Sequence, residues 1–202
     1  MIRSPRAGAQ GWERVSLTRA GVRASIGLVT GLVRRNRLRY LIHDALIVGP
    51  QRAARGDILI EGDRIARIGS IRAATGARRI SGSGLVAVPG FIDLHTHGGM
   101  GFDLTEGLYN AADGTFDSSR AAYACSFPLL SARFARSGVT RALLATFAAP
   151  APQIRRAMTR LAAFIEDPRN GMDGARFEGA CIEGTFLRYA AMAGAQNPEN
   201  FH

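Results

Sequence analysis

Two histidines, His95 and His97, are the residues of this sequence that point most clearly to chemistry. They end an apolar run at residues 91–95 that follows a Pro-Gly turn and is typical of a strand buried on both faces. Side chains two positions apart on a strand face the same way, so the two imidazoles could bind zinc or a similar ion. A chance His-x-His pair is the alternative, but the glycines that follow resemble the point where a barrel strand passes into its catalytic loop.

A carboxylate in a matching position is Glu183, at the carboxyl end of the predicted strand 176–184. Enzymes built on parallel barrels keep their chemistry at the carboxyl ends of the strands, so Glu183 can reach a metal held by the histidine pair. A salt bridge or a charge on the rim is the commoner role for a residue in such a position. Asp103 and Glu106 form a second carboxylate pair, but they belong to a polar, glycine-rich loop and we expect them to be solvated.

Short strands precede the histidine pair. Gly62-Asp63 is a favourable two-residue hairpin turn between two of them. The predicted strands are residues 41–48, 57–61, 64–68 and 85–88.

After the histidine pair, predicted strands and helices alternate, which is the βαβ pattern of a parallel sheet. The first helix is predicted to begin at Ser126, with Pro128 in its first turn, and to end at Gly138. The second is opened by Pro150 and Pro152. Its apolar face consists of Ile154, Met158, Leu161 and Ile165, and the strands of this part are residues 91–95, 140–147 and 176–184. Right-handed crossovers would wind such units into a barrel.

Positive charge is concentrated at the start of the chain. The net charge is +10, and all 26 basic residues are Arg. Residues 1–40 contain nine Arg and one Glu (+8), whereas residues 41–202 contain 17 Arg and 15 acids (+2). We interpret residues 1–38 as a basic, disordered leader, with a targeting segment and an arm for nucleic acid or membrane surfaces as alternatives. Trp12 is the only aromatic residue before Tyr40, so we predict no nucleic-acid partner.

Cysteine content and hydropathy indicate a cytoplasmic protein. Cys125 and Cys181 lie 56 positions apart, which suggests neither a disulfide framework nor a structural zinc site. No apolar run approaches the roughly 18 residues that cross a bilayer, so we expect a soluble protein with no membrane partner. With 202 residues, the chain is also shorter than the about 250 residues of a complete (β/α)8 barrel.

Two stretches of the sequence resemble a known family. The run PGFIDLHTHGG, which contains both histidines, is similar to the first barrel strand of the amidohydrolase superfamily and most similar to that of N-acetylglucosamine-6-phosphate deacetylases. GACIEGTFL at residues 179–187 and GAQNP at residues 194–198 resemble the deacetylase patterns G-x-H-L-E-G-P-F and G-A-H-N-P. The resemblance covers residues 41–202, roughly the first half of such an enzyme.

This resemblance implies a fold and a site. The expected fold is α/β, with a small β-sandwich at residues 39–88 and a partial (β/α)8 TIM barrel of the metal-dependent hydrolase type at residues 89–202, limited to its first three β/α units. The implied metal ligands are His95, His97 and Glu183, around a divalent ion, either zinc or iron. Ala195 and Gln196 stand where the family's Ala-His pair lies at the substrate.

Three positions depart from the family. Cys181 and Gln196 stand where the family has His, and Thr185 stands where it has Pro. Gln can hydrogen-bond a hydroxyl or a carbonyl, but it cannot carry a proton as imidazole does. The departures leave the metal site in place and put the substrate in question.

The implied reaction is hydrolysis of an amide, in particular deacetylation of an N-acetylated amino sugar phosphate. In the family, the proton shuttle is an Asp on a later barrel strand, which would lie beyond residue 202. We therefore expect a truncated enzyme that is inactive by itself and that, at full length, acts on a small molecule as a homodimer. The alternatives are an amidohydrolase for another amide or a cyclic amide, and a non-catalytic remnant that keeps half a barrel.

Overall fold

The computed structural model describes residues 15–19, 22–23, 38–184 and 186–201, with side chains from residue 38 onward. The chain divides into two compact units, Met1–Gly90 and Phe91–His202. Of the predicted leader, only two short stretches and its last residue are described, so the disorder predicted for residues 1–38 stays a prediction. Neither helix in the described part of the chain has the length and apolar character needed to cross a membrane.

The first unit contains one hydrogen-bonded sheet. Its strand order is β2-β1-β7-β3-β4-β5, with β6 also paired to β3. The strands are β1 (Val15–Arg19), β2 (Val22–Arg23), β3 (Arg39–Val48), β4 (Ala53–Glu61), β5 (Arg64–Gly69), β6 (Arg78–Ser81) and β7 (Val86–Pro89). The strands predicted before the histidine pair are confirmed as β3, β4, β5 and β7.

The β4–β5 hairpin and the core of this unit follow from the sequence pattern. Glu61 pairs with Arg64, and Gly62 has a φ of 63°, as the predicted two-residue turn requires. Neighbouring residues of a strand point to opposite faces, and the sheet accordingly has two apolar clusters. One contains Ile42, Ala45, Ile58 and Ala87, and the other contains Leu41, Leu59 and Ile71. The β-sandwich expected here stays a prediction.

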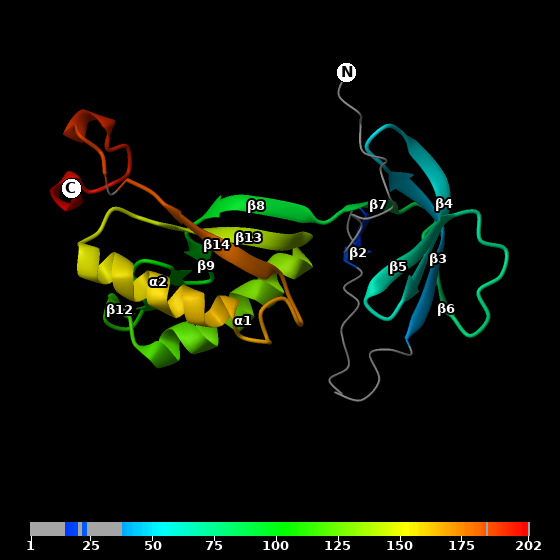
Figure 1. Ribbon diagram of the computed structural model, residues 1–202, viewed down its shortest axis with the longest axis horizontal. Helices are drawn as coiled ribbons and strands as arrows, with labels where there is room; N and C mark the ends of the chain where they lie inside the picture. Colours follow the sequence, from blue (N-terminus) through cyan, green and yellow to red (C-terminus); the bar gives the residue numbers. More distant parts are fainter. Residues whose placement is uncertain (1–14, 20–21, 24–37, 185, 202) are drawn as a thin grey trace, which may run out of the picture. The chain divides into compact units, whose positions relative to one another are not determined.

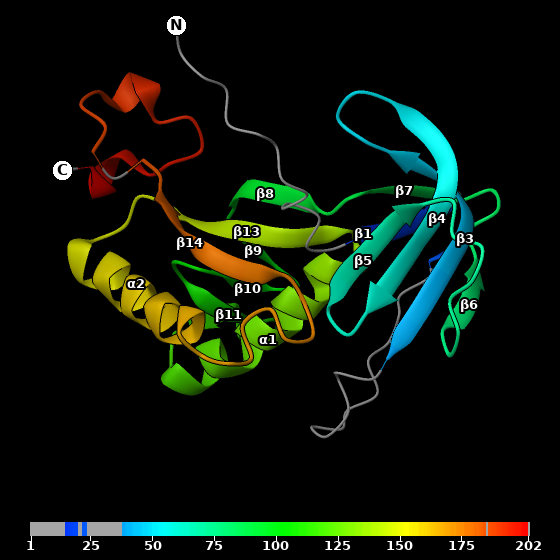
Figure 2. The ribbon, with the colours of Figure 1, turned by 45° about the vertical axis from the view of Figure 1, so that its right-hand side comes forward.

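The second unit is built on three parallel strands in the order β14-β13-β8. Figures 1 and 2 show both helices on the same side of this sheet. The elements are β8 (Phe91–Thr96), a small antiparallel sheet of β9 (Gly98–Gly99), β10 (Phe102–Asp103), β11 (Gly107–Asn110) and β12 (Thr115–Asp117), then α1 (Arg120–Arg136), β13 (Val139–Thr146), α2 (Ala151–Ile165), β14 (Arg176–Ile182) and two 3-10 helices (Ala190–Met192 and Pro198–Asn200). The alternation predicted from the sequence is confirmed. The three strands form an open sheet, and the described residues form no closed barrel.

The predicted start of the first helix is wrong. α1 begins after Ser119, whose side chain accepts a hydrogen bond from the Ala122 amide, so Pro128 lies inside the helix. The reason is packing: Tyr123 and Phe127, one turn apart, are both about 1% exposed and bury their rings in the core between helix and sheet. That burial extends the helix toward its amino end, past the position that Pro128 would otherwise favour.

The second helix matches its prediction. Pro150 is the N-cap residue of α2, and Pro152 lies in the first turn, where a missing amide hydrogen costs no helical hydrogen bond. Ile154 and Leu161 are buried on the predicted face. The remaining members of that face, Met158 and Ile165, pack against the same core from its edge.

The prediction that β8 is buried on both faces is wrong for this chain. Phe91, Ile92 and Leu94 are 54%, 61% and 66% exposed. Within the part of the chain that the structure describes, β8 pairs only with β13, so it is an edge strand of the three-stranded sheet. Among the described residues, no element covers the apolar side chains that a fully enclosed parallel strand would bury.

Candidate metal centre

The chain turns back directly after β8, and this turn fixes the position of His97. Gly98 pairs with Asp103, and a Cβ atom at Gly98 would lie 2.0 Å from the Phe102 carbonyl oxygen. Glycine is therefore required for so close an approach. The His97 carbonyl also accepts a hydrogen bond of 2.8 Å from the Leu104 amide. The backbone on both sides of His97 is thus held by β8 and by the β9–β10 ribbon.

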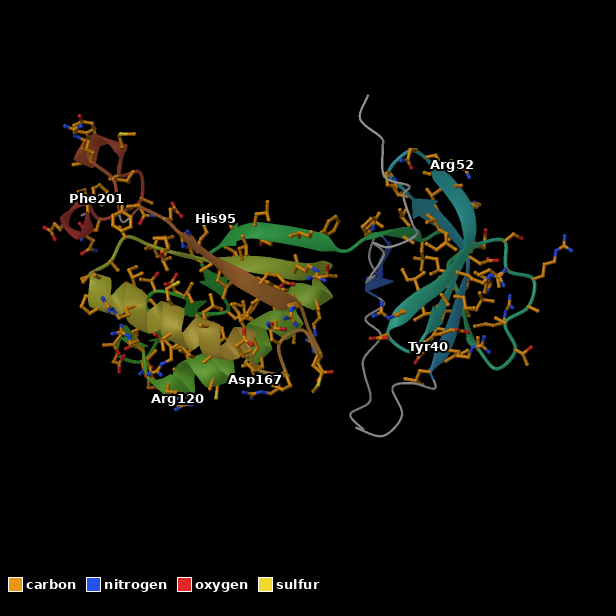
Figure 3. All side chains as sticks on the ribbon, in the orientation of Figure 1. Tyr40, Arg52, His95, Arg120, Asp167 and Phe201 are labelled. Atoms are coloured by element: carbon orange, nitrogen blue, oxygen red, sulfur yellow. The ribbon has the colours of Figure 1, made fainter. Side chains whose placement is uncertain are left out.

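The His95, His97 and Glu183 side chains meet at the carboxyl ends of β8 and β14. His95 Nε2 lies 2.6 Å from Glu183 Oε2, and His97 Nε2 lies 3.1 Å from the same oxygen. The imidazole rings are nearly perpendicular, with centroids 5.1 Å apart. Figure 3 shows His95 at the end of β8 that β14 approaches. The three side chains are 47%, 26% and 37% exposed, so the group is open to small molecules.

Glu183 Oε2 is the centre of this arrangement. The oxygen is buried and has no hydrogen-bond partner among the described residues, and its two imidazole contacts are ion pairs only when the rings are protonated. His97 Nδ1 is likewise buried without a hydrogen-bond partner. Buried polar atoms normally have partners, so a carboxylate oxygen that faces two ring nitrogens without bonding to them is costly. A cation bound among the three atoms would remove this cost, and two imidazoles with one carboxylate are a donor set that divalent zinc or iron accepts.

The surrounding residues support these ligands from the carboxyl end of β13. The Phe147 ring stacks on His97, with a centroid distance of 3.8 Å and an interplanar angle of 5°. The Thr146 hydroxyl, fully buried, accepts a 3.4 Å hydrogen bond from the Glu183 amide. These contacts restrict the orientation of His97 and the path of the chain at Glu183.

The second oxygen of Glu183 is held by Gln196. Gln196 Nε2 donates a hydrogen bond of 3.0 Å to Glu183 Oε1, and Gln196 Oε1 accepts one of 2.6 Å from the Ala148 amide. Gln196 is 8% exposed, whereas Ala195 is exposed. Of the two predicted substrate residues, one therefore has its amide engaged inside the protein, and the other faces solvent.

Asp103 is not the solvated residue that its loop suggested. It is partly buried, and Oδ1 accepts hydrogen bonds from the amides of Thr105 (2.7 Å) and Glu106 (2.9 Å). Burial raises the pKa of the Asp103 carboxyl above its ordinary 3.8, and the two amides and the nearby His97 offset part of that increase. Asp103 thus orders the loop after β10 and lies outside the ligand group.

The structure brings together the three predicted ligands, and they are the one group of three metal-binding side chains found within its described part. Cys181 does not belong to this group, and Thr185 lies outside the described residues. Reasoning from the sequence did not identify three residues that contact the site, Thr146, Phe147 and Ala148. The available signal was their place at the carboxyl end of the strand predicted at residues 140–147, where barrel enzymes carry functional groups.

No protein-family model matches the sequence. The chain is similar to N-acetylglucosamine-6-phosphate deacetylase of Vibrio furnissii, with 32% identity over 134 residues that are 65% of this chain and 29% of the relative. It is also similar to N-acyl-D-glutamate deacylase of Alcaligenes xylosoxydans, with 45% identity over 60 residues, 30% of this chain and 12% of the relative.

The fold resembles a solved structure of N-acetyl-D-glucosamine-6-phosphate deacetylase from Mycobacterium smegmatis. The TM-score is 0.60 at 20% identity, over 82% of this chain and 37% of that one. The chain thus spans well under two thirds of the length of each of these relatives.

Proposed function

Since the chain is a member of the amidohydrolase superfamily that corresponds to part of those enzymes' length, we propose that it supplies the amino-terminal part of a metal-dependent hydrolase of carbon–nitrogen bonds. The observation that carries the proposal is the convergence of His95 Nε2 and His97 Nε2 on one buried oxygen of Glu183. These two contacts are ion pairs only when the imidazoles are protonated. Here two aromatic nitrogens share an oxygen that has no hydrogen bond.

We propose that His95, His97 and Glu183 hold a divalent ion, zinc or iron. When bound there, such an ion supplies a Lewis acid that polarises an acyl carbonyl and lowers the pKa of bound water. The chain's own residues orient the ligands. Phe147 fixes the plane of the His97 ring by stacking, and the β9–β10 ribbon fixes its backbone.

The proposed substrate is an N-acetylated amino sugar phosphate. The support is the similarity to the Vibrio deacetylase, which extends over the larger part of this chain. A second candidate is a different N-acyl substrate. The match to N-acyl-D-glutamate deacylase is shorter than that to the Vibrio deacetylase but has a higher sequence identity, and Gln196 replaces the family's His. Substrate contacts at Ala195 and Gln196 remain part of this proposal.

We propose that the three parallel strands and two crossover helices are the first units of a (β/α)8 barrel. The helices cover one face of the sheet, as the outer ring of a barrel would, and the ligands lie at the carboxyl ends of the strands. The proton-shuttling Asp of the family is not provided by these strands, so the 202-residue chain is proposed to bind metal without turnover. The homodimer and the cytoplasmic location stay predictions.

The test is to measure metal content and activity on the same preparation. The 202-residue chain, dialysed against Zn²⁺ or Fe²⁺ and then against buffer, should retain one ion, and the double variant His95→Ala, His97→Ala should retain none. Acetate release from N-acetylglucosamine 6-phosphate should stay at background for both. Equal metal content in the two proteins would refute the metal site, and turnover by the 202-residue chain would refute the claim that it is only part of an enzyme.

A further inference from the structure

We propose that Gln196 is a positioning residue for the metal ligand Glu183, in addition to any contact with substrate. The inference rests on the proposed metal site. It assigns Gln196 a role that neither its place in the G-A-Q-N-P stretch nor the comparisons give it.

The Gln196 side chain connects a carboxylate, which can only accept hydrogen bonds, to a backbone N–H group, which can only donate one. The Glu183 carboxylate accepts from Nε2, and the Ala148 amide donates to Oε1. Turning the amide round would place oxygen against oxygen and N–H against N–H, so the network allows one orientation. A fixed amide of this kind leaves one oxygen of Glu183 engaged and directs the other, Oε2, toward the two imidazoles.

The packing around Gln196 restricts the amide further. Gly184, next to Glu183 in the chain, has a φ of 75°, and a Cβ atom there would lie 2.7 Å from the Gln196 side chain. The glycine therefore makes room for the amide directly behind the ligand. Gln196 itself is buried, so water does not compete strongly for these hydrogen bonds.

A neighbouring contact provides a matched control. Asn200 Nδ2 donates a 3.0 Å hydrogen bond to the Ala148 carbonyl, so the same segment of the chain is attached to the same loop by a second amide. Within the described part of the chain, Asn200 makes no hydrogen bond or ion pair with Glu183. Removing Asn200 loosens the attachment of the segment, whereas removing the Gln196 amide also releases the carboxylate.

The hydrogen-bond partners of metal ligands fix ligand orientation, and their loss usually weakens metal affinity about 10- to 100-fold. We therefore expect Gln196→Met, which keeps the side-chain length without a donor or an acceptor, to weaken Zn²⁺ binding by that factor. Asn200→Ala should stay within about threefold of the wild type, because it does not touch the ligand. Gln196→His, whose neutral ring offers one donor and one acceptor, should recover part of the loss.

The experiment is a Zn²⁺ competition titration of the wild-type 202-residue chain and the three variants against a chromophoric chelator. Co²⁺ absorption spectra of the same proteins would report ligand geometry independently of activity. Gln196→Met at wild-type affinity, or Asn200→Ala with an equal loss, would overturn the positioning role while leaving the metal site intact. A wild-type chain that binds no Zn²⁺ would overturn the proposed function and this inference together.

Discussion

A variant of Asn170 can test whether a side chain holds the outer edge of β14, the strand that leads into Glu183. Asn170 is 5% exposed and lies between α2 and β14. Its Oδ1 accepts a 2.8 Å hydrogen bond from the Phe177 amide, and its Nδ2 donates to the carbonyls of Phe177 (2.9 Å) and Ile165 (3.2 Å). The side chain thus replaces a neighbouring strand for Phe177, at the start of β14.

Asn170→Ala removes all three hydrogen bonds and leaves the buried amide and carbonyl of Phe177 without this partner. At about 1 to 2 kcal/mol for each orphaned main-chain group, the free energy of unfolding should fall by about 3 kcal/mol. The matched control is Asn110→Ala, because Asn110 Oδ1 also accepts from a backbone amide, that of Ala112, while its Nδ2 donates to the Asp113 side chain and the residue is exposed. The control should lose less than about 1 kcal/mol, since water replaces its partners.

Urea unfolding followed by circular dichroism measures both variants. Zn²⁺ affinity of Asn170→Ala should stay within about threefold of the wild type, because Asn170 lies at the opposite end of β14 from Glu183. Equal stability losses for Asn170→Ala and Asn110→Ala would show that the edge of β14 does not depend on this side chain. A large loss of Zn²⁺ affinity in Asn170→Ala would show that the geometry of the metal ligands depends on the hydrogen bonds at the outer edge of β14.

Three further variants test the surroundings of the site, each by urea unfolding. Gly98→Ala should lose more than about 2 kcal/mol of unfolding free energy, because its Cβ would overlap the Phe102 carbonyl oxygen. Asp103→Asn should be more stable than the wild type at neutral pH, because burial raises the pKa of the Asp103 carboxyl. The stability of the wild type therefore falls as the pH rises from 3.8 through the raised pKa, and the advantage of the variant should vanish near pH 3.8. Tyr123→Phe should lose about 1 to 2 kcal/mol, because the buried Leu104 carbonyl loses its 2.8 Å hydrogen bond from the tyrosine hydroxyl.

Local periodicity predicted the elements that position the ligands. His95 and His97 share one side of a strand end because strand side chains alternate, and Glu183 joins them because parallel strands end at the same edge. The beginning of α1 was mispredicted because the local signal at Pro128 is weaker than the burial of Tyr123 and Phe127, which involves residues distant in the sequence.

The contacts that orient the ligands could not be derived from the sequence. Gln196 reaches Glu183 across a 13-residue separation with no regular periodicity, and Phe147 reaches His97 from a different strand. Such contacts depend on the path of loops, which composition does not determine. The exposure of β8 was not predicted for a related reason. A run of apolar residues shows that a strand can be buried on both faces, but the described part of this chain contains no layer that covers β8.

The central claim is that one cation binds between His95, His97 and Glu183. The most direct measurement is anomalous diffraction at the zinc absorption edge from crystals of the 202-residue chain grown with Zn²⁺. We expect a single peak within about 2.0 to 2.2 Å of both Nε2 atoms and of a Glu183 carboxylate oxygen. A zinc-saturated crystal with no peak there, or with Glu183 Oε2 still in direct contact with both rings, would contradict it.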